Sequence, residues 1–143
     1  MKSVSRTLSD YSIKSYEKLR YSDTDRQGHI NNAVFSTMFE TGRTEFLLDP
    51  EWCLLESGCS FVIARLQVDY LGEITWPGRV DVGTRILSIG TSSMILEQGL
   101  FQAERFVAIA QTVIVQMNEA TRRSHPLSDQ AVHRLKVFMQ QSI

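Results

Sequence analysis

Apolar side chains recur at helical spacing between residues 30 and 47. The members of this stripe follow one another within four positions; they are Ile30, Val34, Phe35, Met38, Phe39, Gly42, Phe46 and Leu47. The polar residues between them fall largely on the opposite side; they are Glu40, Arg43, Thr44 and Glu45. This pattern predicts an amphipathic helix with one buried face. Asn31 or Asn32 can cap its start through a side-chain oxygen, and Pro50 ends it.

Five segments around this helix carry the alternation or the apolar run typical of β-strands. They are residues 11–21, 61–71, 79–89, 93–103 and 106–117. The alternation is clearest in the second segment, where one predicted face consists of Val62, Ala64, Leu66, Val68 and Tyr70. In the third segment, Leu87 and Ile89 break the phase, which predicts a bulge or a strong twist. The fifth segment is a nearly continuous apolar run, and its β-branched residues favour a strand over a helix.

The order of these elements favours an α+β fold. One strand precedes the long helix and four follow it, so a single antiparallel sheet that wraps the helix would bury its apolar stripe. A last helix, capped by Ser128 or Asp129, is predicted near the C-terminus. Residues 1–10 are polar and are expected to form a flexible leader, and residues 11–143 are expected to form a single domain.

The composition excludes several classes of protein. The chain has 143 residues and a formal net charge of -1, so no overall charge draws it to nucleic acid or to an anionic membrane. No apolar run approaches the roughly 20 residues of a membrane span. The N-terminus has no apolar signal-peptide core, which favours a cytoplasmic protein. Cys53 and Cys59 form no CxxC pair, so both are expected to be reduced thiols.

Residues able to carry chemistry gather just before the long helix. The segment Tyr21-Ser-Asp-Thr-Asp-Arg-Gln-Gly-His-Ile-Asn-Asn contains two aspartates, a histidine and a glycine. It leads into a helix N-terminus, whose unpaired N–H groups and partial positive charge suit an anion or a developing oxyanion. The aspartates resemble the start of a calcium loop, but Val34 occupies its twelfth position, where a glutamate is needed. Asp23, Asp25 and His29 are a weak set of ligands for other metals, so no metal site is predicted.

This segment resembles the active-site loop of the hotdog-fold acyl-CoA thioesterases of the 4-hydroxybenzoyl-CoA thioesterase type, and it is most similar to their G-H-x-N-N subgroup. Residues 60–71, the turn at Gly78 and residues 110–115 are similar to that family's strands in order and spacing. The resemblance implies a sheet wrapped around a central helix, and hydrolysis of an acyl-CoA or an acyl-carrier-protein thioester. It also implies a homodimer or homotetramer with active sites at the dimer interface. No cofactor is expected.

The resemblance also implies roles for individual residues. Asp25 matches the catalytic carboxylate, which acts either as the nucleophile or as the base that activates water. An ionised carboxylate cannot donate to an oxyanion, so that role falls to N–H groups around Gly28 and Asn32. His29 and Asn31 are expected to position the loop or the water. A further set of residues is expected to complete the pocket from a second subunit: Phe61, Val62 and Arg65.

Simpler structural roles are open for the same residues. Asp23 and Asp25 can bond their own backbone in turns, and His29 can serve as a structural hydrogen-bonding group. The asparagines can act as helix caps alone, and Arg65 can be merely solvated. Other functions also stay open. Hotdog folds include acyl-thioester dehydratases and hydratases, but their D-x-N-x-x-H arrangement differs from the spacing here. A protein that binds acyl-CoA without turning it over is the non-enzymatic alternative.

Overall fold

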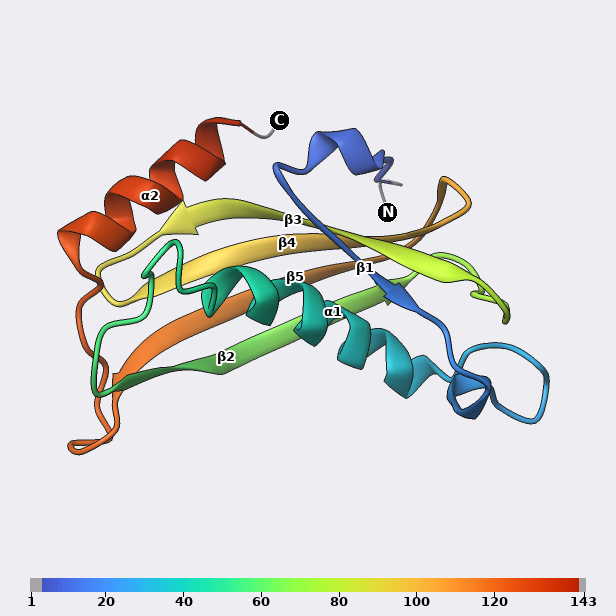
Figure 1. Cartoon of the computed structure of the whole chain (residues 1–143), viewed down its shortest axis with the longest axis horizontal. Helices are drawn as coiled ribbons and strands as arrows, with labels where there is room; N and C mark the ends of the chain where they lie inside the picture. Colours follow the sequence, from blue (N-terminus) through green and yellow to red (C-terminus); the bar gives the residue numbers. More distant parts are fainter. Residues whose placement is uncertain (1–3, 142–143) are drawn as a thin grey trace.

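The computed structural model describes residues 4–141 of the chain, which form five β-strands and two α-helices (Figure 1). Two short 3-10 helices are also present in the described part of the chain. In chain order the elements are η1 (Leu8–Asp10), β1 (Ile13–Lys18), η2 (Tyr21–Asp23), α1 (Asn32–Leu47), β2 (Cys59–Tyr70), β3 (Arg79–Ile89), β4 (Ser93–Gln102), β5 (Arg105–Asn118) and α2 (Asp129–Gln140). Neither α-helix is long and apolar enough to cross a membrane.

The strands form one antiparallel sheet in the order β1-β3-β4-β5-β2. The sheet curves, and α1 runs along it (Figure 1). The predicted α+β architecture, a sheet around a long helix, is therefore confirmed. The nearly apolar run before residue 118 is the strand β5, as its β-branched residues indicate. β1 and β2 are the two edges of the sheet, and β2 is twice as long as β1.

α1 lies very close to the middle of the sheet. A Cβ at Gly42 would come within 2.5 Å of Val82 Cγ1, so only glycine allows this approach. Next to it, the buried side-chain amide of Gln98 donates hydrogen bonds to the Phe39 carbonyl and to Thr84 Oγ1, each at 3.0 Å. The hydrogen bond from Gln98 of the sheet to the Phe39 carbonyl of α1 fixes the distance of the helix from the sheet and its position along its own axis.

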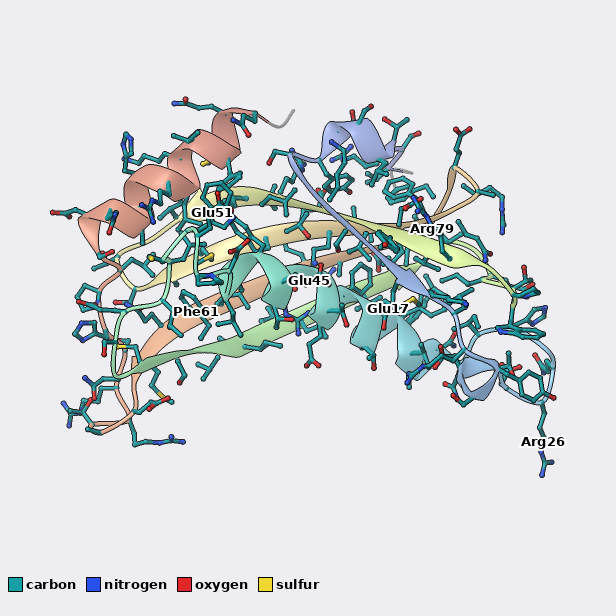
Figure 2. The ribbon with its side chains drawn as sticks, viewed as in Figure 1. Glu17, Arg26, Glu45, Glu51, Phe61 and Arg79 are labelled. Atoms are coloured by element: carbon teal, nitrogen blue, oxygen red, sulfur yellow. The ribbon has the colours of Figure 1, made fainter. Side chains whose placement is uncertain are left out.

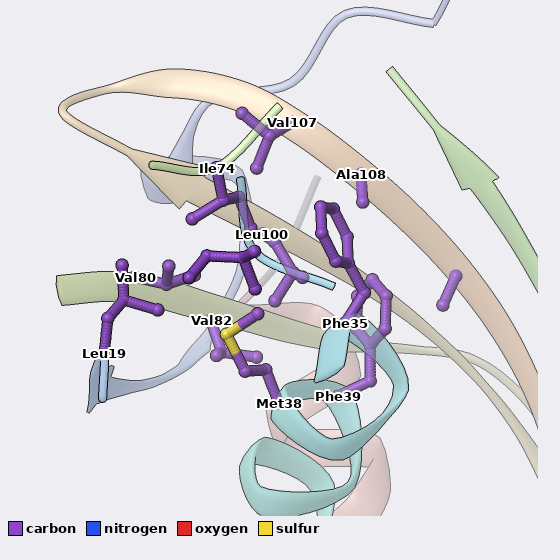
Figure 3. Close-up of a cluster of buried hydrophobic side chains, with 12 residues drawn as sticks. Leu19, Phe35, Met38, Phe39, Ile74, Val80, Val82, Leu100, Val107 and Ala108 are labelled. Atoms are coloured by element: carbon purple, nitrogen blue, oxygen red, sulfur yellow. The ribbon is translucent and has the colours of Figure 1, made fainter. Parts of the chain in front are cut away.

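The apolar stripe of α1 separates the core into two clusters. The cluster at the N-terminal half, shown in Figure 3, consists of Leu19, Ile30, Phe35, Met38, Phe39, Ile74, Val80, Val82, Leu100, Val107, Ala108 and Ala110. The cluster at the C-terminal half includes Phe46, Leu47 and Leu54 with side chains of β3, β4 and β5. α2 covers this second cluster, and its Phe138 ring packs edge-on against Phe46 and Trp52.

The register shifts at three places in the described sheet, and two of these shifts concern strands whose faces are predicted from the sequence. The register of β3 shifts between Ile86 and Ser88, which confirms the bulge predicted there. A second shift, between Ile63 and Arg65 of β2, was not predicted. A bulge adds one residue to its strand, so the faces before and after it exchange. The predicted common face for Val62 and Leu66 is therefore wrong: Val62 pairs with Val115, whereas Leu66 pairs with buried Thr112.

The N-terminal segment is packed on the sheet from Arg6 onward, which differs from the flexible leader expected for residues 1–10; residues 1–3 lie outside the described part. The ring of Tyr11 lies against Gly83 and Gly99, where any Cβ would clash with it. Its hydroxyl donates to Glu97 at 2.9 Å. Glu97 also accepts hydrogen bonds from the guanidinium groups of Arg6 and Arg85. The segment is thereby held by a nearly buried carboxylate.

Replacement of Glu97 by glutamine is expected to lower the free energy of unfolding by about 3 kcal/mol at neutral pH, because two guanidinium groups lose their buried counter-charge. Burial raises the pKa of Glu97, but hydrogen bonds from the two arginines and the tyrosine outweigh it and hold that pKa below its usual value. The advantage of the wild type is therefore complete above the ordinary glutamate pKa of about 4.3, and it is lost as the pH falls through the lower folded pKa. Urea unfolding curves at neutral and strongly acid pH measure this, and an equal difference at both would contradict it.

Candidate functional site

Asp23 holds the two ends of the loop before α1 together. Its carboxylate is buried and accepts hydrogen bonds from the Arg20 N–H at 2.9 Å and from the Arg20 guanidinium at 3.1 Å. Its backbone carbonyl accepts from the N–H of Asn31, the residue that caps α1, at 2.9 Å. The start of the loop is thus tied to the start of the helix. Asp23 therefore has a structural role. Its carboxylate bonds Arg20, which precedes it in the chain, and does not form a turn with the residues that follow it.

Asp25 lies at the exposed end of the same loop. Its Oδ1 accepts hydrogen bonds from the backbone N–H groups of Gln27 at 2.8 Å and His29 at 3.2 Å. Both bonds go to Oδ1, and no hydrogen bond from the described residues engages Oδ2. Oδ2 is therefore available to contact water or a ligand. The two N–H groups fix the carboxylate in one orientation without consuming its second oxygen. This geometry serves a turn and also a reacting carboxylate.

Gly28 closes the turn that begins at Asp25. Its φ is +83°, a region that side chains with a Cβ rarely adopt. The Gly28 N–H donates to the Asp25 carbonyl at 3.2 Å, and the Asp25 N–H donates to the His29 carbonyl at 2.8 Å. A Cβ at Gly28 would meet no atom within 4 Å. Glycine is therefore required at this position by the backbone conformation, and the space next to it is open.

His29 bonds the Asp25 carboxylate through its backbone N–H, whereas its imidazole has a different partner. Its Nε2 lies 3.1 Å from Glu73 Oε2, and its backbone forms a β-bridge with Thr75. The buried amide of Gln102 bonds both the N–H and the carbonyl of Thr75, at 3.0 and 2.7 Å. The loop that contains Asp25 is thus held to the loop before β3. Sequence reasoning missed both Glu73 and Gln102, because their partners are distant in the chain.

The two asparagines define the start of α1. Asn31 is its N-cap, and its Oδ1 accepts from the Ala33 N–H at 3.0 Å. Asn32 is the first helical residue, and its carbonyl accepts from the Tyr70 hydroxyl at 3.4 Å. The first-turn N–H groups have no acceptor within the helix, and the helix dipole makes this end partly positive. The loop that carries Asp25 therefore leads directly into a site that favours negative charge.

The residues predicted to act from a second subunit lie at the start and middle of β2, whereas the Asp25 loop is near its end. Tyr70, at the end of β2, contacts the start of α1. Phe61 is nine residues earlier, on the order of 30 Å away at about 3.3 Å per residue. Figure 2 likewise shows Phe61 in the left half of the molecule and Arg26 at its right end. Val62 is half-buried and Arg65 is exposed, its guanidinium donating to Gln67. The single chain therefore does not bring these residues to the Asp25 loop.

A cavity of about 350 Å³ opens between β2 and the C-terminal half of α1. Its walls are mainly apolar and include Leu47, Leu55, Phe61 and Ile63. Arg43 also lines it and is only 4% exposed, so its prediction on the polar side of the helix is wrong. Its Nη1 has no hydrogen-bond partner among the described residues. Burial lowers the pKa of the guanidinium, and the nearby charge of Glu40 opposes this effect.

Comparison with known proteins agrees with this architecture. The sequence model of the thioesterase-like superfamily matches residues 19–135, which include the loop, α1 and the whole sheet apart from β1. The chain belongs to the thioesterase-like superfamily. The acyl-CoA thioester hydrolase YbgC of Escherichia coli O6:H1 is 24% identical over 115 residues, which cover 78% of this chain and 83% of YbgC.

Two solved structures extend the comparison within this superfamily. A thioesterase from Thermus thermophilus, crystallised with coenzyme A and zinc, is 30% identical, with a TM-score of 0.80 over 92% of this chain and 97% of its own. A predicted thioesterase from Bacillus stearothermophilus is also 30% identical, with a TM-score of 0.78 over 88% of this chain and 95% of its own. The hotdog fold expected from the loop motif is confirmed.

The two aspartates of the loop are expected to differ in their effect on stability. Asp23→Ala should lower the free energy of unfolding by about 2 kcal/mol, because it removes a buried carboxylate with charge-assisted bonds to Arg20. Asp25→Ala should lower it by about 1 kcal/mol or less, because water can replace an exposed carboxylate. Urea unfolding of both variants measures the difference. A larger loss for Asp25→Ala would contradict these structural roles.

Proposed function

We propose that this protein hydrolyses an acyl-CoA thioester to the free acid and CoA, as a member of the subgroup with the G-H-x-N-N motif. The observation that carries the proposal is the exposed Asp25 carboxylate, held by two N–H groups at one oxygen in a loop that leads into the N-terminus of α1. The relative named as an acyl-CoA thioester hydrolase and the Thermus thermophilus thioesterase with coenzyme A support the substrate class.

Asp25 acts on the thioester carbonyl by one of two routes. In the first, its carboxylate forms a C–O bond to the acyl carbon and expels the thiolate of CoA, and water then cleaves the mixed anhydride. In the second, it takes a proton from water, and the water oxygen attacks the acyl carbon as the C–S bond breaks. Either route consumes one water and yields one acid and one thiol.

The oxyanion that forms at the carbonyl needs donors that an ionised aspartate cannot supply. The N–H groups between Gly28 and Asn32 are the candidates, with that of Asn32 first, because it belongs to the unpaired first turn of α1. His29 and Asn31 act as positioning residues. His29 holds the loop through Glu73, and Asn31 holds the helix start through the Ala33 N–H.

A positively charged pocket next to this loop supports a carrier that bears phosphates. Arg79 and Arg105 line a pocket of about 460 Å³ together with Thr75, which forms a β-bridge with His29. Guanidinium groups bind phosphate oxygens through paired N–H donors, although Arg79 is also 2.8 Å from Asp81. With the exposed Arg65, these arginines are candidates for contacts to the phosphates of CoA. A carrier protein is the alternative donor of the acyl group.

A second copy of the chain, paired at β2, would complete the site. β2 is a long edge strand, and Ile63, Leu66 and Tyr70 on it are 38–48% exposed. Such an edge pairs readily with another strand. Antiparallel pairing of two β2 strands sets the start of one beside the end of the other. Phe61, Val62 and the cavity of the second copy would then approach Asn32 of the first, and the acyl group would enter that cavity. This is the homodimer, or half of the homotetramer, that we propose.

Asp25→Asn is expected to lower the rate of thioester hydrolysis by at least about a thousandfold, because an amide neither attacks a carbonyl nor accepts a proton from water. The substitution keeps the size of the side chain and one acceptor oxygen, so the loop should stay folded. Release of free thiol from short, medium, long and aromatic acyl-CoAs measures the effect. The matched control is Asp129→Asn, in an exposed carboxylate at the start of α2, which should retain full activity.

Full activity of Asp25→Asn would remove the assignment. Repeated turnover in heavy-oxygen water separates the two routes, since label enters the Asp25 carboxylate only if that carboxylate attacks. Addition of water to enoyl thioesters would indicate a hydratase instead. Tight binding of acyl-CoA without hydrolysis by the wild type, and without turnover of carrier-protein thioesters, would indicate a non-catalytic binding protein.

Leu66→Lys is expected to convert the dimer to a monomer and to abolish hydrolysis, because it buries a charge in the proposed β2 interface. Sedimentation equilibrium at micromolar concentration measures the mass. Val137→Lys, at an exposed apolar position of α2, serves as the control and should leave both mass and activity unchanged. A fully active monomer of Leu66→Lys would contradict a site shared between two copies.

A further inference from the structure

Three potential metal ligands meet at the end of the molecule that lies away from the Asp25 loop. Glu56 and Cys59 come from the segment that opens β2, and His125 comes from the loop between β5 and α2. One ligand atom from each lies within 4.8 Å of the other two, and His125 Nε2 is 2.8 Å from Glu56 Oε2. Among residues 4–141, no other group of three histidine, cysteine, aspartate or glutamate side chains brings its ligand atoms within this distance.

A buried glutamine holds the two loops that carry these ligands. Gln116 of β5 is fully buried, and its Oε1 accepts from the Glu56 N–H at 3.0 Å. Its Nε2 donates to the carbonyls of His125 at 3.2 Å and Pro126 at 3.0 Å. Cys59 is tied in as well, since its N–H donates to the Glu56 carbonyl at 3.1 Å. The backbone at all three ligands is therefore fixed by bonds that do not involve the ligand atoms.

The geometry is close to what a tetrahedral metal requires. Zinc binds imidazole nitrogen and carboxylate oxygen at about 2.0–2.2 Å and thiolate sulfur at about 2.3 Å, so its ligand atoms lie roughly 3.3–3.8 Å apart. Atoms already within 4.8 Å of one another reach these separations by small side-chain rotations, because Glu56 and His125 are both partly exposed. Three protein ligands leave a fourth position to water.

The charges in the cluster also match a divalent cation. The Cys59 side chain is buried, and its sulfur lies within 4.8 Å of a carboxylate oxygen of Glu56. The sulfur therefore lies in apolar and negative surroundings, which a cation neutralises. One thiolate and one carboxylate, beside a neutral imidazole, balance a charge of +2, and such a set is typical of zinc and of similar soft divalent ions.

We propose that Glu56, Cys59 and His125 form a binding site for one soft divalent cation, with zinc as the first candidate. No metal site is predicted from the sequence, because Cys59 and His125 are 66 positions apart and form no recognisable spacing. The bound ion clamps the start of β2 to the loop before α2. Cys59 also lines the cavity beside α1, so the ion sets the position of one wall of that cavity.

The test uses the untagged full chain, stripped with a chelator and then titrated with zinc or cobalt(II). Calorimetry should give one zinc per chain, and cobalt should produce a thiolate-to-metal absorption band in the near ultraviolet. Cys59→Ser should abolish the band, and Glu56→Gln and His125→Gln should each weaken zinc binding at least about tenfold. The matched controls Cys53→Ser and His133→Gln should bind zinc as the wild type does.

Three results would overturn the proposal: no zinc binding by the wild type, an unchanged affinity in all three ligand variants, or an equal loss in the two controls. Circular dichroism establishes that each variant is folded. If Cys59→Ser fails to fold because its thiol is buried, the Glu56→Gln and His125→Gln variants still decide the matter, since both side chains are partly exposed. If both of these variants bound zinc as tightly as the wild type, the cluster would be only an ion pair beside a buried thiol and the proposal would be wrong.

Discussion

The close contact between α1 and the sheet at Gly42 is the constraint on which the rest of the structure depends. The missing Cβ lets the helix approach Val82, and Gln98 fixes the helix along its axis through the Phe39 carbonyl. Each large side chain of the apolar stripe then contributes about 1.5–3 kcal/mol by burial. A helix held in this way has a fixed N-terminus. The position of the Asp25 loop is therefore set by the contact at Gly42, about three helical turns from the start of α1. Only the shape of the loop depends on local bonds.

The local hydrogen bonds place the two aspartates of the loop in different environments. Asp23 is buried and satisfied, and it joins the loop to the cap residue Asn31. Asp25 is exposed and is held at one oxygen only. A carboxylate with all its lone pairs engaged is a poor base or nucleophile, whereas an unheld one is poorly placed. The D-x-D spacing thus separates the buried carboxylate that positions the loop from the exposed carboxylate that we propose to be the reacting group.

The sequence predicts most of the fold because the fold rests on periodicity. The bounds of β3 are as predicted, and the other strands and α1 differ from their predictions by few residues. The faces of β2 were not predictable, because a single extra residue at the bulge exchanges them and leaves no composition signal. Arg43 was expected on the polar side of the helix, although it is four residues from both Phe39 and Leu47 of the apolar stripe, and its side chain is buried beside the cavity. Partners that arise only from tertiary contact, such as Glu73 for His29 and Gln116 for the cluster around Cys59, leave no local pattern either.

The unpaired edge of β2 and the buried guanidinium of Arg43 are best understood together. A guanidinium in an apolar cavity is costly unless something supplies an acceptor, and the Nη1 of Arg43 has none among the described residues. The cavity opens next to the edge strand whose apolar side chains are exposed. Both features are unfavourable in an isolated chain, and both lie on the surface that a second copy would cover. We therefore propose that the Asp25 carboxylate at one end of α1 and the cavity at its other end become neighbours only when two copies of the chain associate.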